Sequence, residues 1–242
     1  MKSDRKSYIG KSHKSERSYT KPILIIFLLL LLVFLLYWGV KIVAIRNSPD
    51  FDLNKKAAYY FVLSGYDSNP EKFIETGISN KLLLVDGEKR TVNIIDVPAT
   101  LFISSKKLEI SSVSPKDFAF YLMDVLGTKV DYTYVIYQKP EYFKRAGISN
   151  IDELIQKYGK RGLRIIDYFT LQKQVIELRP ESVITDGALA KLYYVLGKFA
   201  IRNYSLPLLT QKPLKITVDG KVYYRTYLDE ERIADFVNDF KK

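Results

Sequence analysis

Asp67 is the first residue whose type and position could support chemistry. It lies in the loop Gly65-Tyr66-Asp67-Ser68, directly after the aromatic and β-branched run Ala57–Leu63, which predicts a strand. A carboxylate at the end of a strand could hold a hard cation such as Mg²⁺ or border a phosphate site. An aspartate after a strand also forms an Asx turn with its own backbone, and we favour the turn.

Arg161 and Arg164 are the basic candidates, within the cluster KRGLR that begins at Lys160. Guanidinium groups bind phosphate oxygens in a bidentate manner, so the cluster could contact a phosphate or an anionic lipid headgroup. A solvated surface turn is the more ordinary interpretation. The sequence identifies no catalytic residue and no specific metal; Mg²⁺ is expected only if the protein is catalytic.

The composition excludes several kinds of site. The 242-residue chain has no cysteine and a single histidine, His13. Disulfides, thiol nucleophiles and cysteine-ligated zinc are therefore ruled out, and a histidine-centred triad is nearly excluded. Any metal would be a hard cation held by carboxylates and phosphate.

The net charge of +11 is concentrated near the N-terminus. Up to Arg46 the chain has nine Lys or Arg and two acids, whereas the remainder has 29 Lys or Arg and 25 acids. No zinc-finger, basic-zipper or RNA-binding aromatic signature accompanies this charge. We therefore expect no nucleic-acid partner.

A membrane-spanning helix is predicted over Pro22–Val40, which is 19 residues without a charge. A bilayer core needs about 20 apolar residues in a helix. Tyr37 and Trp38, at the far end, are typical of a membrane interface. A cleaved signal peptide is the alternative, but the following KIVAIRN has no small-residue cleavage site. We therefore predict an uncleaved signal anchor that crosses the cell membrane once.

The orientation follows from the basic residues before the helix, which favour a cytoplasmic N-terminus and an extracytoplasmic C-terminal domain. We accordingly divide the chain into a basic cytoplasmic tail (1–21), a transmembrane anchor (22–43), a linker (44–56) and an extracytoplasmic domain (57–242).

Strands and helices alternate through this domain. Hairpins are predicted about Asp86-Gly87 and Asp219-Gly220, and helix starts at Ser114, Asn150 and Asp229. The predicted strands are 57–63, 81–85, 91–97, 132–137, 163–166, 214–218 and 222–227, with 101–105 extending the first sheet, and the predicted helices are 115–126, 151–158, 168–178, 184–199 and 230–240. This pattern predicts an α/β fold in which a mixed β-sheet is layered with helices.

Two further features are open to more than one interpretation. Asp96 lies within an apolar strand and needs a partner if it is buried, although an exposed position near the sheet edge is favoured. The many aromatic residues between Tyr59 and Tyr194 could line a lipid or glycan cavity, but at strand and helix periods they are more often core.

Several short motifs follow one another in a specific order. They are the GYDS loop at Gly65, KLLLV at Lys81, Val97-Pro98, Leu126-Gly127, Asp131-Tyr132 and the C-terminal run VDGKVYYRTYLDEERIADFV. Their order, after a basic tail and one anchor, resembles that of the LytR–CpsA–Psr (LCP) family of cell-envelope proteins over residues 57 to 242.

The resemblance implies a membrane-anchored enzyme that transfers a glycan phosphate from a polyprenyl-diphosphate carrier to the cell wall with Mg²⁺, as part of cell-wall biogenesis. The family's Arg-x-Asp motif falls on Ile78-Ser79-Asn80, and its later Arg-Asp pair falls on Ala99 and Thr100. These residues cannot hold pyrophosphate or a metal as arginine and aspartate do. No family position matches the later basic residues Arg164, Lys173, Arg179 and Arg202.

Three hypotheses remain for the function. The first is an envelope protein with a degenerate active site, which binds a polyprenyl-linked or wall glycan, or an envelope partner protein, without turnover. The second is an active, divergent LCP-type phosphotransferase whose basic residues have moved. The third is a bitopic scaffold of the envelope or division machinery.

Overall fold

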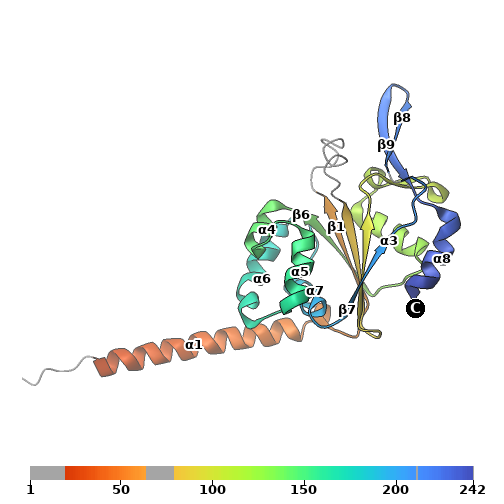
Figure 1. Cartoon of the computed structure of the whole chain (residues 1–242). Coiled ribbons are helices and arrows are strands. Elements are labelled where there is room, and N and C mark those ends of the chain that lie inside the picture. The colour runs from red at the N-terminus through yellow and green to blue at the C-terminus, as the bar shows by residue number, and fades with distance from the viewer. Residues whose placement is uncertain (1–19, 64–78, 211, 242) are drawn as a thin grey trace, which may run out of the picture. The chain divides into compact units, whose positions relative to one another are not determined.

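The computed structural model describes residues 20–63, 79–210 and 212–241 (Figure 1). Asp67 with its loop, Ile78 and the N-terminal tail lie outside these residues. The chain divides into two compact units, Met1–Val43 and Ala44–Lys242.

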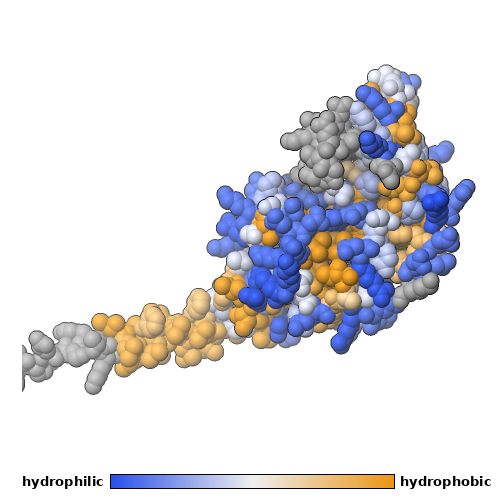
Figure 2. Space-filling view, in the orientation of Figure 1, coloured by the Kyte–Doolittle hydropathy of each residue, from blue (hydrophilic) through white to orange (hydrophobic). Residues whose placement is uncertain are grey.

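Helix α1 (Thr20–Arg46) contains the predicted membrane segment. Pro22–Arg46 has a mean hydropathy of 3.1, which makes it long and apolar enough to cross a membrane. At 1.5 Å per residue, the 27-residue helix is about 40 Å long, compared with about 30 Å for a bilayer core. Its apolar side chains are exposed along its length (Figure 2). The hydrocarbon core of a bilayer is an environment in which such exposure is favourable.

The larger unit is built on a mixed five-stranded sheet in the order β6-β1-β2-β3-β7. Its strands are β1 (Ala57–Leu63), β2 (Asn80–Asp86), β3 (Thr91–Val97), β6 (Tyr132–Gln138) and β7 (Ala200–Ser205). Strand β1 is buried along its whole length, as its continuous apolar run predicts for a strand covered on both faces. The fold-class prediction is confirmed.

Helices cover both faces of this sheet (Figure 1). On one face lie α3 (Pro115–Val125) and α8 (Glu230–Lys241), and on the other lie α4 (Pro140–Ala146), α5 (Ile151–Arg161), α6 (Ile165–Leu178) and α7 (Asp186–Leu196). Short 3₁₀ turns occupy Pro49–Phe51, Ser104–Lys106 and Ile110–Ser112.

A second, four-stranded sheet has the order β5-β4-β9-β8. Its strands are β4 (Leu101–Ile103), β5 (Leu108–Glu109), β8 (Leu214–Val218) and β9 (Lys221–Tyr227). The prediction that 101–105 extends the first sheet is wrong. After Pro98 the chain turns, with Leu101 N–H donating to the Pro98 carbonyl, and β4 pairs in parallel with β9 instead.

The predicted helix starts at Ser114, Asn150 and Asp229 are confirmed. Each side chain accepts a hydrogen bond from the backbone N–H three residues further on, at distances of 3.2, 2.9 and 3.2 Å. These bonds satisfy N–H groups that the first turn of a helix leaves without a partner.

The strand predicted over 163–166 is wrong, because α6 already begins at Ile165. The Asp167 carboxylate accepts a hydrogen bond from Arg164 N–H at 2.8 Å, which caps the helix start. The helix predicted over 184–199 is shorter and ends before Gly197, and the following β7 was not predicted. The seven-residue helix α4 was also missed.

The segment predicted as a linker is packed against the domain. Phe51 is buried, and the Asp50 carboxylate accepts hydrogen bonds from Tyr134 at 2.7 Å and from Thr185 at 2.5 Å. The Lys191 ammonium group, which is fully buried, donates to the Lys55 carbonyl at 2.7 Å. The chain between α1 and β1 is therefore held at several points.

Gly197, at the end of α7, packs against Gly162, at the end of α5, and the two backbones lie in close contact there. A Cβ atom at Gly197 would lie 2.3 Å from the Gly162 Cα atom, whereas one at Gly159 would make an ordinary 3.4 Å contact with Ile201.

We predict that Gly197→Ala lowers the free energy of unfolding by about 1–3 kcal/mol through overpacking. Gly159→Ala should raise it by up to about 1 kcal/mol through helix propensity. Urea titrations followed by circular dichroism measure both, and equal effects would contradict the packing.

Candidate functional site

The carboxyl ends of four strands meet at one edge of the five-stranded sheet. Strands β1 and β6 are parallel, β3 and β7 are parallel, and β2 runs antiparallel to both β1 and β3. The start of β2 therefore lies at the same edge, where Asn80 pairs with Val97. Ligands of open α/β sheets bind outside the carboxyl ends of strands. The family-motif positions Asn80, Ala99 and Thr100 thus lie close together at the expected edge.

Asn80 is buried, with 1% of its surface exposed, and both ends of its amide are engaged. Its oxygen accepts a hydrogen bond from Leu63 N–H at 2.8 Å, and its Nδ2 donates to the Tyr60 hydroxyl at 3.3 Å. Burial raises the pKa of Tyr60, and this outweighs the opposing effect of the bond from Asn80. Tyr60 therefore stays neutral at ordinary pH. The role of Asn80 is structural, because its amide provides hydrogen-bond partners for two residues of β1.

Thr100 is engaged in the same way. Its hydroxyl lies 2.7 Å from the Thr226 hydroxyl, and its carbonyl accepts a hydrogen bond from Thr226 N–H at 2.8 Å. Both side chains are almost fully buried. Thr100 therefore holds β9 of the second sheet beside the end of β3. Asn80 and Thr100 do not form a magnesium site, because neither is a carboxylate and both oxygens already have protein partners.

Lys81 is a cation at this edge, and the sequence did not identify it as a candidate site residue. Its ammonium group pairs with Asp96 on β3 and lies 3.0 Å from Asp152 at the start of α5. Burial alone would lower the pKa of Lys81, but the two carboxylates raise it above 10.5 overall. Asp96 is exposed, as expected, and the structure adds a partner that the sequence alone did not identify.

At the end of β6, the side chains of Gln138 and Lys139 also have partners within the protein. Gln138 Nε2 donates to the Ser79 carbonyl at 3.3 Å, and Lys139 donates to the Arg179 carbonyl at 3.2 Å and pairs with Glu181. Hydrogen bonding to Lys139 lowers the pKa of the Glu181 carboxyl. The strand ends Leu63, Ser79–Lys81, Asp96–Thr100 and Gln138–Lys139 include no arginine.

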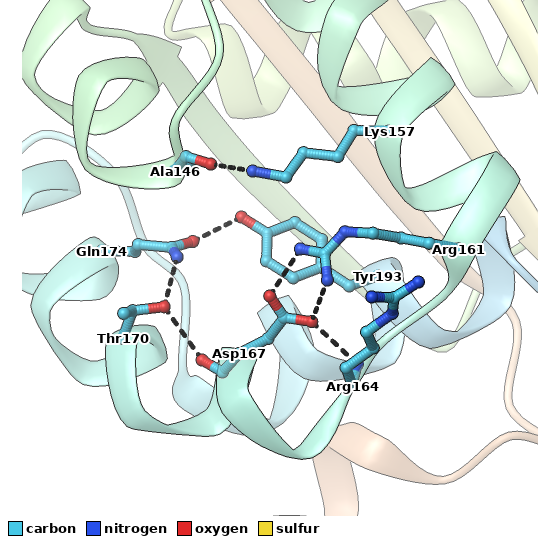
Figure 3. A network of polar contacts seen from close by, with 8 residues as sticks. All are labelled: Ala146, Lys157, Arg161, Arg164, Asp167, Thr170, Gln174 and Tyr193. Atoms are coloured by element: carbon cyan, nitrogen blue, oxygen red, sulfur yellow. Dashed lines mark hydrogen bonds and ion pairs between the residues drawn. The ribbon is translucent and has the colours of Figure 1, made fainter.

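Arg161 lies at a different place and has a structural partner (Figure 3). Its guanidinium donates to both oxygens of Asp167, at 3.1 and 2.6 Å, and lies over the Tyr158 ring at 4.9 Å. Asp152 and Arg161 are nine residues apart on α5, which corresponds to about 14 Å. Arg161 is therefore neither free to bind phosphate nor close to Asn80.

Arg164 lies beside Arg161, at the start of α6. Its backbone N–H bonds to Asp167, and its side chain is exposed. Of the other basic residues considered, Arg179 borders a cavity on the outside of α6, and its backbone carbonyl accepts a hydrogen bond from Lys139 at the end of β6. Arg202 lies opposite Asn93 in the β3–β7 register. The structure does not bring these arginines together at the sheet edge.

The aromatic residues mainly form core. Tyr59, Tyr60, Phe61, Phe118 and Tyr193 are fully buried. Tyr193 stacks on Tyr158 with 3.7 Å between ring centroids. Its hydroxyl donates to Gln174 at 2.6 Å (Figure 3). The same hydroxyl lies 2.8 Å from the Tyr142 hydroxyl. This network fills the space between α4, α5, α6 and α7. Phe120 and Tyr121 of α3 are exposed.

Three cavities border the described residues elsewhere. One of about 190 Å³ lies at the opposite edge of the sheet and is lined by Lys56, Asp86, Asn93, Lys129 and Arg202 among others. One of about 320 Å³ lies between α6 and the start of α7, and one of about 220 Å³ lies beside the start of α3. Asn80, Lys81 and Thr100 line none of the three. Within the described ranges, no group of three or more His, Asp or Glu is placed to hold a metal.

Known proteins resemble this chain in structure rather than in sequence. No protein-family model and no curated protein matches it. The Lin1025 protein from Listeria innocua matches with a TM-score of 0.49 and 13% identity, over 78% of this chain and 97% of that one. TagT of Bacillus subtilis matches with a TM-score of 0.44 and 9% identity, over 81% of this chain and 94% of TagT. A third match is a structure of the LytR-CPS2A-psr family protein YwtF (TagT) with bound octaprenyl pyrophosphate lipid. It has a TM-score of 0.44 and 10% identity, over 81% of this chain and 93% of that one.

The bonds of Asn80 generate a stability prediction. Asn80→Leu keeps the volume but leaves the Leu63 N–H and the Tyr60 hydroxyl without a partner. We expect a loss of about 1–3 kcal/mol in the free energy of unfolding. Asn203→Leu, at an exposed position of β7, should change it by less than about 0.5 kcal/mol. Urea denaturation tests both variants, and a neutral Asn80→Leu would refute the assigned role.

The ion pairs of Lys81 generate a pH prediction. Because its folded pKa lies above the unfolded value of 10.5, the stability it contributes is present below 10.5 and is lost as pH rises through the folded pKa. Lys81→Met should therefore be less stable than the parent at pH 7, by on the order of 1 kcal/mol. The gap should narrow above about pH 11. Lys144→Met, at an exposed position, should show no such trend. A difference in free energy of unfolding between Lys81→Met and the parent that stays constant or grows above about pH 11 would contradict the pairing of Lys81 with Asp96 and Asp152.

Proposed function

We propose that this chain is a divergent member of the LCP family, anchored in the cell membrane by α1 with its domain outside the cytoplasm. In this proposal the protein has lost the transferase site of the family. It acts by binding a polyprenyl-linked or wall glycan, or an envelope partner, without chemical turnover. The order of motifs in the sequence supports the family assignment, and the basic tail supports the orientation.

The observation that carries the loss of catalysis is the hydrogen bonding at the sheet edge. Phosphoryl transfer requires groups that neutralise the charge developing on the transferred phosphate. Asn80 and Thr100 stand at the motif positions, and their polar atoms are bound to Leu63, Tyr60 and Thr226. The cation nearby, Lys81, is paired with two carboxylates. Among the described residues of this edge, few polar groups are therefore left to bind a pyrophosphate.

Binding of octaprenyl pyrophosphate to the purified full chain separates the hypotheses. We expect measurable binding that is the same in Mg²⁺ and in EDTA, because Asn80 and Thr100, which stand where the family motifs have charged residues, offer no carboxylate to bridge a metal to the phosphates. Octaprenol, which lacks the pyrophosphate, should bind nearly as well, since an apolar surface would supply most of the affinity. Wall-acceptor glycan added with a polyprenyl-pyrophosphate-linked donor should give no transferred product.

Other outcomes point to the alternatives. Binding that requires Mg²⁺, together with product formation, would overturn the proposal in favour of an active transferase. Absence of binding to both lipids and to wall glycan would overturn ligand binding and favour a scaffold.

A further inference from the structure

Two large apolar side chains stand exposed at the start of α6. Ile165 is 70% exposed and Ile166 is 65% exposed, although they are the first two residues of the helix. Two exposed cations lie nearby in the chain: Arg164 directly precedes Ile165, and Lys160 lies five residues before it. Exposed apolar side chains bordered by basic residues are typical of elements that rest in a membrane interface.

The start of α6 is tied directly to the end of the membrane helix. Arg46, the last residue of α1, donates through Nε to the Tyr168 hydroxyl at 3.0 Å, and its guanidinium lies 6.0 Å from the centre of that ring. Tyr168 is three residues after Ile165 on the same helix. Whatever positions Arg46 therefore also positions the first turn of α6.

The length of α1 places Arg46 close to the lipid headgroups. Lys41 is the first charged residue after the apolar segment, and its ammonium group lies 4.9 Å from the Trp38 ring, which suits the edge of the hydrocarbon. Arg46 follows five residues later, or about 7.5 Å along a helix. The polar interface of a bilayer is about 5–7 Å deep on each side. Arg46, and with it Tyr168, consequently lies at headgroup level if α1 spans the membrane.

We propose that Lys160 and Arg164–Ile166 form a membrane-contact corner that rests on the bilayer surface. The isoleucine side chains enter the interface, and Lys160 and Arg164 meet anionic phosphate headgroups. Arg161 takes no part, because Asp167 already holds it. The corner rests on the anchoring of α1 that forms part of the proposed function, but it does not depend on what the sheet edge binds.

The membrane-contact corner is separate from the candidate site. The corner lies at the end of α5, whereas Asp152 and Lys81 at the start of α5 belong to the sheet edge, about 14 Å away along that helix. The corner and the candidate site therefore share no residue.

The absence of cysteine in the chain allows a direct test. The single variants Ile166→Cys, Ile176→Cys and Val40→Cys are labelled with a nitroxide in the full chain and reconstituted into vesicles of phosphatidylcholine and phosphatidylglycerol. Ile176 is the matched control, because it is 60% exposed on the same helix but ten residues further from its start. Val40 reports whether α1 spans the bilayer. Spin-label accessibility to oxygen and to a water-soluble nickel chelate gives the depth of each label.

We expect the label at 166 to be severalfold less accessible to the nickel chelate than the label at 176. The pair Lys160→Glu and Arg164→Glu, introduced together with Ile166→Cys, should reverse this protection. Equal nickel accessibility at 166 and 176, with 40 buried in lipid, would overturn the corner and leave the anchor intact. An aqueous label at 40 would overturn the anchor, and the corner with it.

Discussion

The amide of Asn80 holds together the part of the fold on which this account depends. Strand β1 is buried on both faces, so the N–H at its carboxyl end has no access to water and requires a partner within the protein. Asn80 supplies that partner and at the same time binds the hydroxyl of Tyr60. An arginine or a metal-bound aspartate at this edge would have its polar atoms directed to a ligand. Here the partners come from within the protein: the neutral side chains of Asn80 and Thr100, together with the ion pairs of Lys81 and Lys139.

The two helical layers depend on different forces. On the face of α3 and α8 the core is apolar, and its cluster extends into the second sheet through Leu101 and Ile103. On the face of α4 to α7, buried tyrosines, Gln174 and the Arg161–Asp167 pair form a connected polar network. Because each member of such a network satisfies its neighbours, the network favours one arrangement of the four helices. It also accounts for Arg161 without any ligand.

The sequence predicted the fold well where local signals and burial agree. The continuous apolar run of β1, the Asp-Gly hairpins and the caps at Ser114 and Asn150 depend on residues close in the chain, and they were confirmed. Strand β7 was missed because its residues AIRNYS are mostly polar, as suits an edge strand. The strand predicted at 163–166 failed because the Asp167 carboxylate, a few residues on, starts a helix there. The site could be predicted only in outline. The neutral positions are visible in the sequence, but their partners Leu63, Thr226 and Asp152 are distant along the chain.

The proposed loss of the transferase site requires that the sheet edge does not hold a divalent cation for phosphoryl transfer. Paramagnetic Mn²⁺, which prefers the same oxygen ligands as Mg²⁺, tests it directly. Amide resonances of Leu63, Asn80 and Thr100 would be followed by NMR while Mn²⁺ is added to the full chain with octaprenyl pyrophosphate present. The account predicts that these resonances broaden no more than those of exposed residues on β7. Selective broadening of all three at stoichiometric Mn²⁺ would contradict it.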